Sequence, residues 1–265
     1  MAARAATATA GDAIERALPL LDPAKRKAGT LVPAGYFDLL GPEPPRSTGF
    51  AQDLMLTGVV PRIYERWWRP ALGRVAKGVL GPGMQDEHRI ARLLLSLSRG
   101  DHVLDVACGT GNFTRDFARS VGSKGLAVGI DVSETMLTKA VADTDGAGLG
   151  EQAGYIRGDA QELPFRDHRF DAVCCFAAFH LFADPMRALD RMAAVLKPGG
   201  RIALFTSARG RSAPVRTVES LLTGRSGARM FEQDEVARAL ERRGFAEVRQ
   251  RITGITQFVG GRLAD

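Results

Sequence analysis

The chain has 265 residues, and its 45% hydrophobic content is enough for the buried core of one domain with an extension. It has no run of about 18 or more apolar residues, which argues against a transmembrane helix, and its N-terminus lacks the apolar stretch of a secretory signal. Among the three cysteines, the neighbours Cys174 and Cys175 cannot form an ordinary disulfide, so a reducing cytoplasm is the expected compartment. No clustering of Cys and His indicates a metal site.

The net charge of +6 is distributed unevenly. Residues 1–100 carry 14 Lys and Arg against 9 Asp and Glu, whereas residues 101–265 carry 22 against 21. A second basic concentration lies late in the chain, at Arg209, Arg211, Arg216, Arg225 and Arg229. These arginines could hold an acidic acceptor or could form a solvated loop. A basic chain can bind nucleic acid, but no RNA-binding module or zinc knuckle occurs, so a nucleic-acid substrate is the less favoured reading.

The first part of the chain differs in composition from the rest. Residues 1 to about 50 are rich in Pro, Gly and Ala and predict an extended arm with a short structured piece near GYFDLL. Residues 51–80 predict two short helices broken at Pro70. Aromatic residues at helical spacing lie on the first of them, namely Tyr64, Trp67 and Trp68. We therefore expect an N-terminal arm and helical cap over residues 1–83.

From residue 84 onward helical and strand patterns alternate. The predicted elements are a helix at 84–98, a strand at 102–107, a helix at 112–120, a strand at 125–130, a helix at 133–142, strands at 153–157 and 170–176, a helix at 184–195 and a strand at 201–206. Two further β-rich runs, 246–252 and 255–259, flank a Thr-Gly turn and predict a hairpin. This order implies an α/β domain with a doubly wound parallel sheet and a ligand at its carboxyl edge.

The most informative segment is VLDVACGTGN, at residues 103–112. A buried strand runs through a tight glycine turn into a helix, which places backbone N–H groups and the positive end of the helix dipole around a small polar ligand. We expect the glycines to let that ligand approach the main chain, because they lack Cβ. Asp131 ends the next strand, 20 residues after Gly111. A carboxylate at that point can accept hydrogen bonds from both ribose hydroxyls of an adenosine-containing cofactor.

The details of the turn distinguish between cofactors. A dinucleotide fingerprint has a third glycine where this chain has Thr114, which disfavours a nicotinamide-binding reductase. Asp105 lies four positions before Gly109, and the pattern D-x-A-C-G-T-G resembles motif I of the class I S-adenosylmethionine (SAM)-dependent methyltransferases. The likeness is greatest to the ubiquinone/menaquinone-type C-methyltransferases and their small-molecule relatives.

Further motifs of that family follow in order. YIRGDAQELPF at 155–165 resembles the third motif, FDAVCCF at 170–176 resembles the fourth strand, and LKPGGR at 196–201 resembles the turn before strand five. The resemblance covers residues 84–265. It implies a Rossmann-like, seven-stranded, mostly parallel sheet with an antiparallel C-terminal strand and a helical N-terminal extension.

The resemblance also implies which residues bind SAM and its product S-adenosylhomocysteine. Asp131 would hold the ribose, Asp159 the adenine amine and the Ala160 N–H a ring nitrogen, while the main chain near Phe176 would face the methionine end. The implied cofactor-binding set is Asp105, Ala107, Gly109, Thr110, Gly111, Asp131, Val132, Asp159, Ala160 and Phe176.

The acceptor side is less defined by the sequence. His180, just past the fourth strand, is the candidate general base, or else it packs in the following loop. In relatives a tyrosine on an N-terminal helix closes over the methionine end of SAM, so Tyr64, Trp67 and Trp68 fit either a lid or a core. Their extended N-terminal signature is absent here, and the segment 207–230 matches no pattern.

We therefore expect in-line methyl transfer to a small hydrophobic metabolite such as a quinone, polyketide or lipid-like phenol, by a monomer or homodimer. An RNA methyltransferase and a catalytically silent SAM-binding fold are the alternatives.

Overall fold

The computed structural model describes residues 10–42, 83–210 and 228–265. The helices predicted between 51 and 80, together with Tyr64, Trp67 and Trp68, lie outside the described residues, as do Arg211, Arg216 and Arg225. The helices are α1 (Ala10–Ala17), α2 (Pro23–Ala28), α6 (Met84–Leu95), α7 (Asn112–Val121), α8 (Glu134–Gly146), α9 (Pro185–Val195) and α11 (Glu235–Glu241), with the 3-10 turns η1 (Leu18–Leu20), η3 (Ala160–Glu162) and η4 (Phe179–Leu181). The strands are β1 (Thr30–Leu31), β2 (Phe37–Asp38), β3 (His102–Val106), β4 (Leu126–Asp131), β5 (Ala153–Arg157), β6 (Phe170–Phe176), β7 (Leu196–Ser207), β8 (Phe245–Thr253) and β9 (Thr256–Leu263).

The described strands form one sheet in the order β1-β2-β5-β4-β3-β6-β7-β9-β8. All pairings from β2 to β7 are parallel, whereas β9 pairs antiparallel with β7 and β8 antiparallel with β9. The expected doubly wound α/β sheet with an antiparallel C-terminal end is therefore confirmed. The described sheet has nine strands where the sequence predicted seven, because β1 and β2 extend the edge beyond β5.

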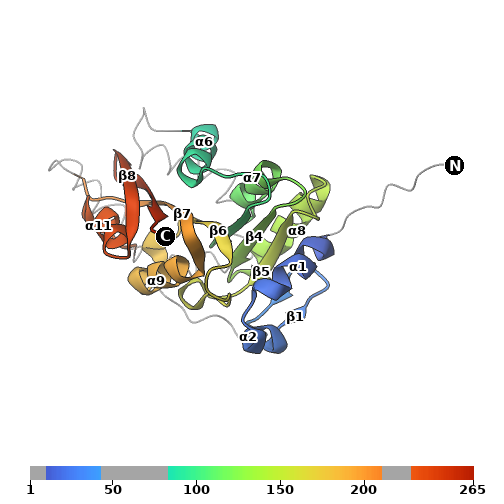
Figure 1. Ribbon diagram of the computed structural model, residues 1–265. Coiled ribbons are helices and arrows are strands. Elements are labelled where there is room, and N and C mark those ends of the chain that lie inside the picture. The colour runs from blue at the N-terminus through green and yellow to red at the C-terminus, as the bar shows by residue number, and fades with distance from the viewer. Residues whose placement is uncertain (1–9, 43–82, 211–227) are drawn as a thin grey trace.

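Two layers of helices cover the sheet because successive side chains of the central strands point to opposite faces. In β3, Leu104 and Val106 lie in the cluster that α1, α9 and α11 complete. Val103 points to the opposite face, where α6 and α7 pack, and α8 packs there against Tyr155. The two helical layers are visible on either side of the strands in Figure 1. Burial on both faces explains the nearly continuous apolar strands. None of the described helices has the length and apolar character that crossing a membrane requires.

The N-terminal segment corrects the expectation of an extended arm. Residues 10–17 form α1, whose Ala13, Ile14 and Ala17 are buried against the sheet. Gly154 lies beneath this helix, and a Cβ there would come within 3.1 Å of the α1 backbone, so a larger residue would require α1 to shift by a few tenths of an ångström. The structured piece predicted near GYFDLL is present as β2, which pairs in parallel with β5.

Element ends differ from the predictions by a few residues. The helix predicted to reach residue 98 ends at Leu95, because Ser96 adopts a left-handed conformation with φ of 47°. The strand predicted at 201–206 begins already at Leu196, and the hairpin strands extend to Thr253 and Leu263.

Arg16 anchors the N-terminal segment at the amino edge of the sheet. Its guanidinium donates to the carbonyl oxygens of Glu151 at 2.7 Å and Gly125 at 2.6 Å, and more loosely to those of Lys124 and Ser123. Arg16→Met should therefore lower the free energy of unfolding by about 1–3 kcal/mol, since these carbonyls lose a charged donor. Urea unfolding followed by circular dichroism measures this. The exposed Arg26→Met on α2 is the matched control, and equal effects of both variants would contradict the anchoring role.

Candidate functional site

The glycine turn follows β3 at the carboxyl edge of the sheet and is fixed by the neighbouring strand. The N–H of Cys108 donates to the carbonyl of Ile130 at 3.1 Å. The Asp131 carboxylate accepts from the N–H of Gly109 through Oδ2 and from the N–H of Ser133 through Oδ1, both at 2.9 Å. Asp131 thus joins the turn after β3 to the turn after β4. Burial raises the pKa of Asp131 against the lowering effect of these N–H donors.

The two glycines of the turn serve different purposes. Both have positive φ, 55° at Gly109 and 71° at Gly111. A Cβ on Gly111 would lie 2.3 Å from the Tyr155 hydroxyl, so this glycine is required by packing inside the protein. A Cβ on Gly109 would meet no protein atom within 4 Å. Only Gly109 therefore fits the expectation that the glycines leave room for a ligand. Ala107 also has positive φ, 57°, which marks a sharp change of direction after β3.

Asp105 lies in β3, just before the turn, where it is buried and accepts from two side chains. The Thr114 hydroxyl donates to its Oδ2 at 2.6 Å and the Cys174 thiol to its Oδ1 at 3.4 Å. Thr114 occupies the position of the third glycine of a dinucleotide fingerprint, so its hydroxyl explains the difference from that motif. Burial raises the pKa of Asp105 to about 6.

Arg115 is a contributor that the sequence patterns did not single out. Its guanidinium donates to the carbonyl oxygen of Thr110 and to Oδ1 of Asn112, both at 2.6 Å, and lies 3.6 Å from Asp143. The side chain of Thr110 is buried, at 3% exposure. The turn is thus held from its helix side as well as from Asp131. The sequence did not predict this role, because a basic residue within a helix is usually solvent-exposed.

The third predicted motif lies beside Asp131. The N–H of Gly158 donates to the Asp131 carbonyl at 3.0 Å, which places Asp159 directly after this contact. Asp159 caps η3 by accepting from the N–H of Gln161 at 2.8 Å, and Ala160 is nearly buried. The cysteine in the glycine turn is not activated, because burial raises the pKa of the Cys108 thiol well above its usual range.

The predicted cofactor residues converge on one edge. They lie in the last residues of β3, β4 and β6 or just after β3, β4 and β5, and the carboxyl ends of these four neighbouring parallel strands meet there. Phe176 ends β6 and packs against Phe113, with ring centroids 4.6 Å apart. The set at this edge is Asp105, Ala107, Gly109, Thr110, Gly111, Asp131, Val132, Asp159, Ala160 and Phe176.

His180 lies in η4, just beyond the same edge. Its Nδ1 is 3.4 Å from the Thr206 hydroxyl, and its carbonyl accepts from the N–H of Arg229 at 2.9 Å. Burial lowers the pKa of His180 to about 4, so the imidazole is neutral near pH 7. By contrast, His88 stacks on Phe113 at 4.2 Å and contacts Asp116 at 3.2 Å. In the described ranges, no three His, Cys, Asp or Glu side chains lie together as a metal ion would require.

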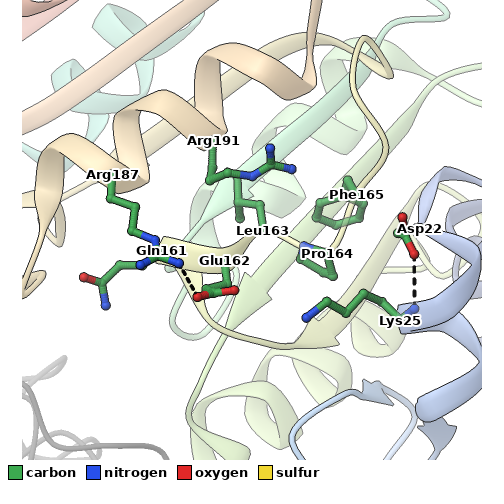
Figure 2. A pocket seen from close by; sticks show the side chains of 9 residues that line it. All are labelled: Asp22, Lys25, Gln161, Glu162, Leu163, Pro164, Phe165, Arg187 and Arg191. Carbon is green, nitrogen blue, oxygen red and sulfur yellow. Dashed lines mark hydrogen bonds and ion pairs between the residues drawn. The ribbon is translucent and has the colours of Figure 1, made fainter.

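A cavity of about 200 Å³ lies on the outer side of the loop that follows Ala160, between α2 and α9 (Figure 2). Leu163, Pro164 and Phe165 form its apolar part, and Arg187 pairs with Glu162 at its rim. The other lining residues are Asp22, Lys25, Gln161 and Arg191. The cavity is therefore formed by residues 161–165 of the third motif together with α9 and the N-terminal segment.

Residues 103–200 match the family model of a methyltransferase domain. Over 120 residues the chain is 37% identical to the ubiquinone/menaquinone biosynthesis C-methyltransferase UbiE of Idiomarina loihiensis, covering 45% of this chain and 48% of that protein. It is 38% identical over 109 residues to the demethylmenaquinone methyltransferase of Bacillus cytotoxicus, covering 41% and 46% respectively. The chain spans about half the length of these curated relatives.

Solved structures share the fold. A phosphoethanolamine N-methyltransferase 2 from Haemonchus contortus, in complex with phosphomonomethylethanolamine and S-adenosylhomocysteine, superposes with a TM-score of 0.65 at 15% identity, over 83% of this chain and 61% of that one. A SAM-dependent methyltransferase from Aquifex aeolicus gives 0.57 at 20% identity, over 77% and 98%. At such identities the likeness establishes the Rossmann-like methyltransferase fold.

The buried carboxyl of Asp105 makes stability depend on pH. Because the folded-state pKa of about 6 exceeds the ordinary 3.8, the folded state keeps the proton longer than the unfolded state, and stability falls as pH rises between these values. Asp105→Asn cannot ionise there. We expect the unfolding free energy of the variant minus that of wild type to rise between about pH 4 and pH 6 and then to level off.

Urea unfolding at a series of pH values measures this difference, and Asp145→Asn on the exposed side of α8 controls for the removal of one negative charge. A constant difference across the series would contradict the buried, proton-retaining state of Asp105.

Proposed function

Since residues 103–200 form a methyltransferase domain of the class I SAM-dependent type, we propose that this protein transfers a methyl group from SAM to a small hydrophobic acceptor. The observation that carries the proposal is the arrangement around Asp131. The Asp131 carboxylate is held by the N–H groups of Gly109 and Ser133, with a smaller contribution from the N–H of Val132. A carboxylate has about four acceptor sites, so Asp131 keeps capacity for a ribose hydroxyl beside the open side of Gly109.

The remaining predicted residues fit the other parts of the same ligand. Asp159 and Ala160 follow the strand next to Asp131, where the adenine is expected, and Phe176 ends the strand on the other side of β3, toward the methionine end. Asp105 shapes the turn through Thr114 and Cys174. When bound, SAM supplies a methyl group already activated by the sulfonium charge. The residues of this chain then align the acceptor and exclude water, and such positioning supplies roughly 7–11 kcal/mol of barrier reduction.

The acceptor class follows from the named relatives and from the chemistry. Two relatives are named for ubiquinone/menaquinone or demethylmenaquinone methylation, which supports a quinone-type acceptor here. An electrophilic methyl group requires an electron-rich partner, so the acceptor reacts as the reduced quinol form. His180, neutral near pH 7, accepts the proton that such an acceptor loses. Tyr64, Trp67 and Trp68 remain predicted to form either a lid or part of the core. Action as a monomer or homodimer in the cytoplasm belongs to the same proposal.

The first test is binding of S-adenosylhomocysteine. At 100 times its dissociation constant a ligand stabilises the folded state by about 2.7 kcal/mol, which raises the melting temperature by about 5–10 °C for a chain of this size. NADPH is the parallel control. Asp131→Asn should weaken S-adenosylhomocysteine binding by about 1.5–3 kcal/mol, because one charged acceptor is lost. Calorimetric titration measures this, with the exposed Asp167→Asn as the matched control. A rise with NADPH alone would reject the proposed function.

The role of His180 is tested separately from cofactor binding. His180→Gln keeps a polar side chain of similar size but removes the base, so methyl transfer to reduced demethylmenaquinone should slow about 100-fold or more. The affinity for S-adenosylhomocysteine should stay unchanged. Since the pKa of His180 lies at about 4, the wild-type rate should show no inflection from this histidine between pH 5 and pH 8. A variant with the wild-type rate would exclude His180 as the base.

A further inference from the structure

Arg157 is a buried arginine at the carboxyl end of β5, with 3% of its surface exposed. Its Nη1 lies 3.0 Å from Oδ2 of Asp38 and 3.1 Å from Oε1 of Glu134, and donates to the carbonyl of Gly41 at 2.5 Å. Its Nε donates to the carbonyl of Val132 at 3.2 Å. One guanidinium thus connects the N-terminal segment, the central sheet and the turn after β4.

The contacts of Arg157 reach the ribose side of the candidate site. Val132 and Glu134 flank Ser133, whose N–H donates to Asp131. The carbonyl of Asp131 accepts from Gly158, and the next carbonyl, that of Val132, accepts from Arg157. Two consecutive carbonyls of this turn are therefore held from the end of β5. These two contacts hold the backbone of the turn that carries the Asp131 carboxylate.

The N-terminal segment holds Arg157 from the other side. Asp38 is directly opposite Arg157 in the β2–β5 register, and the N–H of Leu39 donates to the Arg157 carbonyl at 3.0 Å. Asp38 is itself fixed, because its Oδ1 accepts from the N–H groups of Leu40 and Gly41. A buried guanidinium requires such a partner, since an unpaired charge in the interior is strongly destabilising.

The same segment also backs the loop of the third motif. Leu21 bridges to Phe165, the N–H of Asp22 donates to the carbonyl of Pro164 at 2.9 Å, and Arg166 donates to the carbonyl of Leu20 at 3.0 Å. Figure 2 shows Asp22, Pro164 and Phe165 around the cavity at this contact. Residues 20–41 therefore support both the turn 131–134 and the loop 159–166, which we call the adenosine loops.

We propose that Arg157 is a positioning residue for the adenosine half of the cofactor site, acting through Val132 and Glu134, and that β2 belongs to that site through Asp38. The identity of the ligand bound by the adenosine loops rests on the proposed function. The positioning of the turn 131–134 by Arg157 does not. Arg157 touches no expected ligand atom in this role. It sets the geometry of the turn that carries Asp131.

Four variants separate positioning from general stability. Arg157→Met removes both the charge and the contact to Val132, and Asp38→Asn weakens the anchor while keeping the Oδ1 acceptor. Arg157→Lys keeps the charge, but one ammonium group cannot replace both Nη1 and Nε. Arg16→Met is the matched control, because Arg16 fixes the same N-terminal segment to carbonyls at the opposite, amino edge of the sheet.

The first readout is hydrogen exchange of the ligand-free protein, measured by mass spectrometry. For Arg157→Met and Asp38→Asn we expect faster exchange in peptides covering 38–42 and 131–137, with strands β3 and β7 unchanged. Arg157→Lys should keep the melting temperature close to that of wild type and still speed exchange at 131–137. Arg16→Met should leave 131–137 as in wild type.

The second readout is affinity for S-adenosylhomocysteine and for 5′-methylthioadenosine, which share the adenosine part. Arg157→Met should weaken both by the same factor of about 3- to 30-fold, and Arg16→Met neither. Unchanged exchange at 131–137, or faster exchange spread over the whole domain, would overturn the positioning role. If wild type bound neither ligand while the local exchange effect appeared, the proposed function would fail and the positioning of this turn would stand.

Discussion

The candidate site depends on the hydrogen bonds of the Asp131 carboxylate, because they link two loops that α7 and β4 separate along the chain. The carboxylate accepts from the N–H of Gly109 in the glycine turn and from N–H groups of its own turn, so the ends of β3 and β4 keep a fixed relation. The surrounding contacts serve this arrangement. Arg115 and Thr114 hold the glycine turn from the helix side, and Gly158 and Arg157 hold the Asp131 turn from β5. A ligand at this edge meets acceptors already in place.

Much of the fold could be predicted because the central strands are buried on both faces and are therefore nearly continuously apolar. The glycine turn, Asp131 and the C-terminal hairpin could be predicted because each depends on residues that are close in sequence. The N-terminal segment was not readable in this way. Its β2 has two residues and pairs with a strand more than a hundred positions away, and Gly154 reveals its purpose only when α1 lies above it. The role of Arg157 was not predicted for the same reason, since tertiary structure brings its partners Asp38 and Glu134 to it.

For two residues of the glycine turn and its helix, the sequence motif was identified correctly but its physical explanation was incomplete. Both glycines of the turn were expected to make room for a ligand, yet Gly111 is constrained by the Tyr155 hydroxyl. Thr114 was informative as the absence of a glycine, whereas its hydroxyl is a donor to the buried Asp105. The motif indicated these two positions, and the contacts in the structure show the physical role of each residue.

The pairing of β2 with β5 has a consequence for synthesis of the chain. Asp38 leaves the ribosome 119 residues before Arg157, its partner in the finished sheet. At about 5–20 residues per second this delay is on the order of 10 s. During that time the apolar side chains of Ile14, Leu21 and Phe37 have no sheet to cover them. This segment therefore waits for the strand with which it pairs, and its apolar side chains are open to chaperones and to aggregation during that interval.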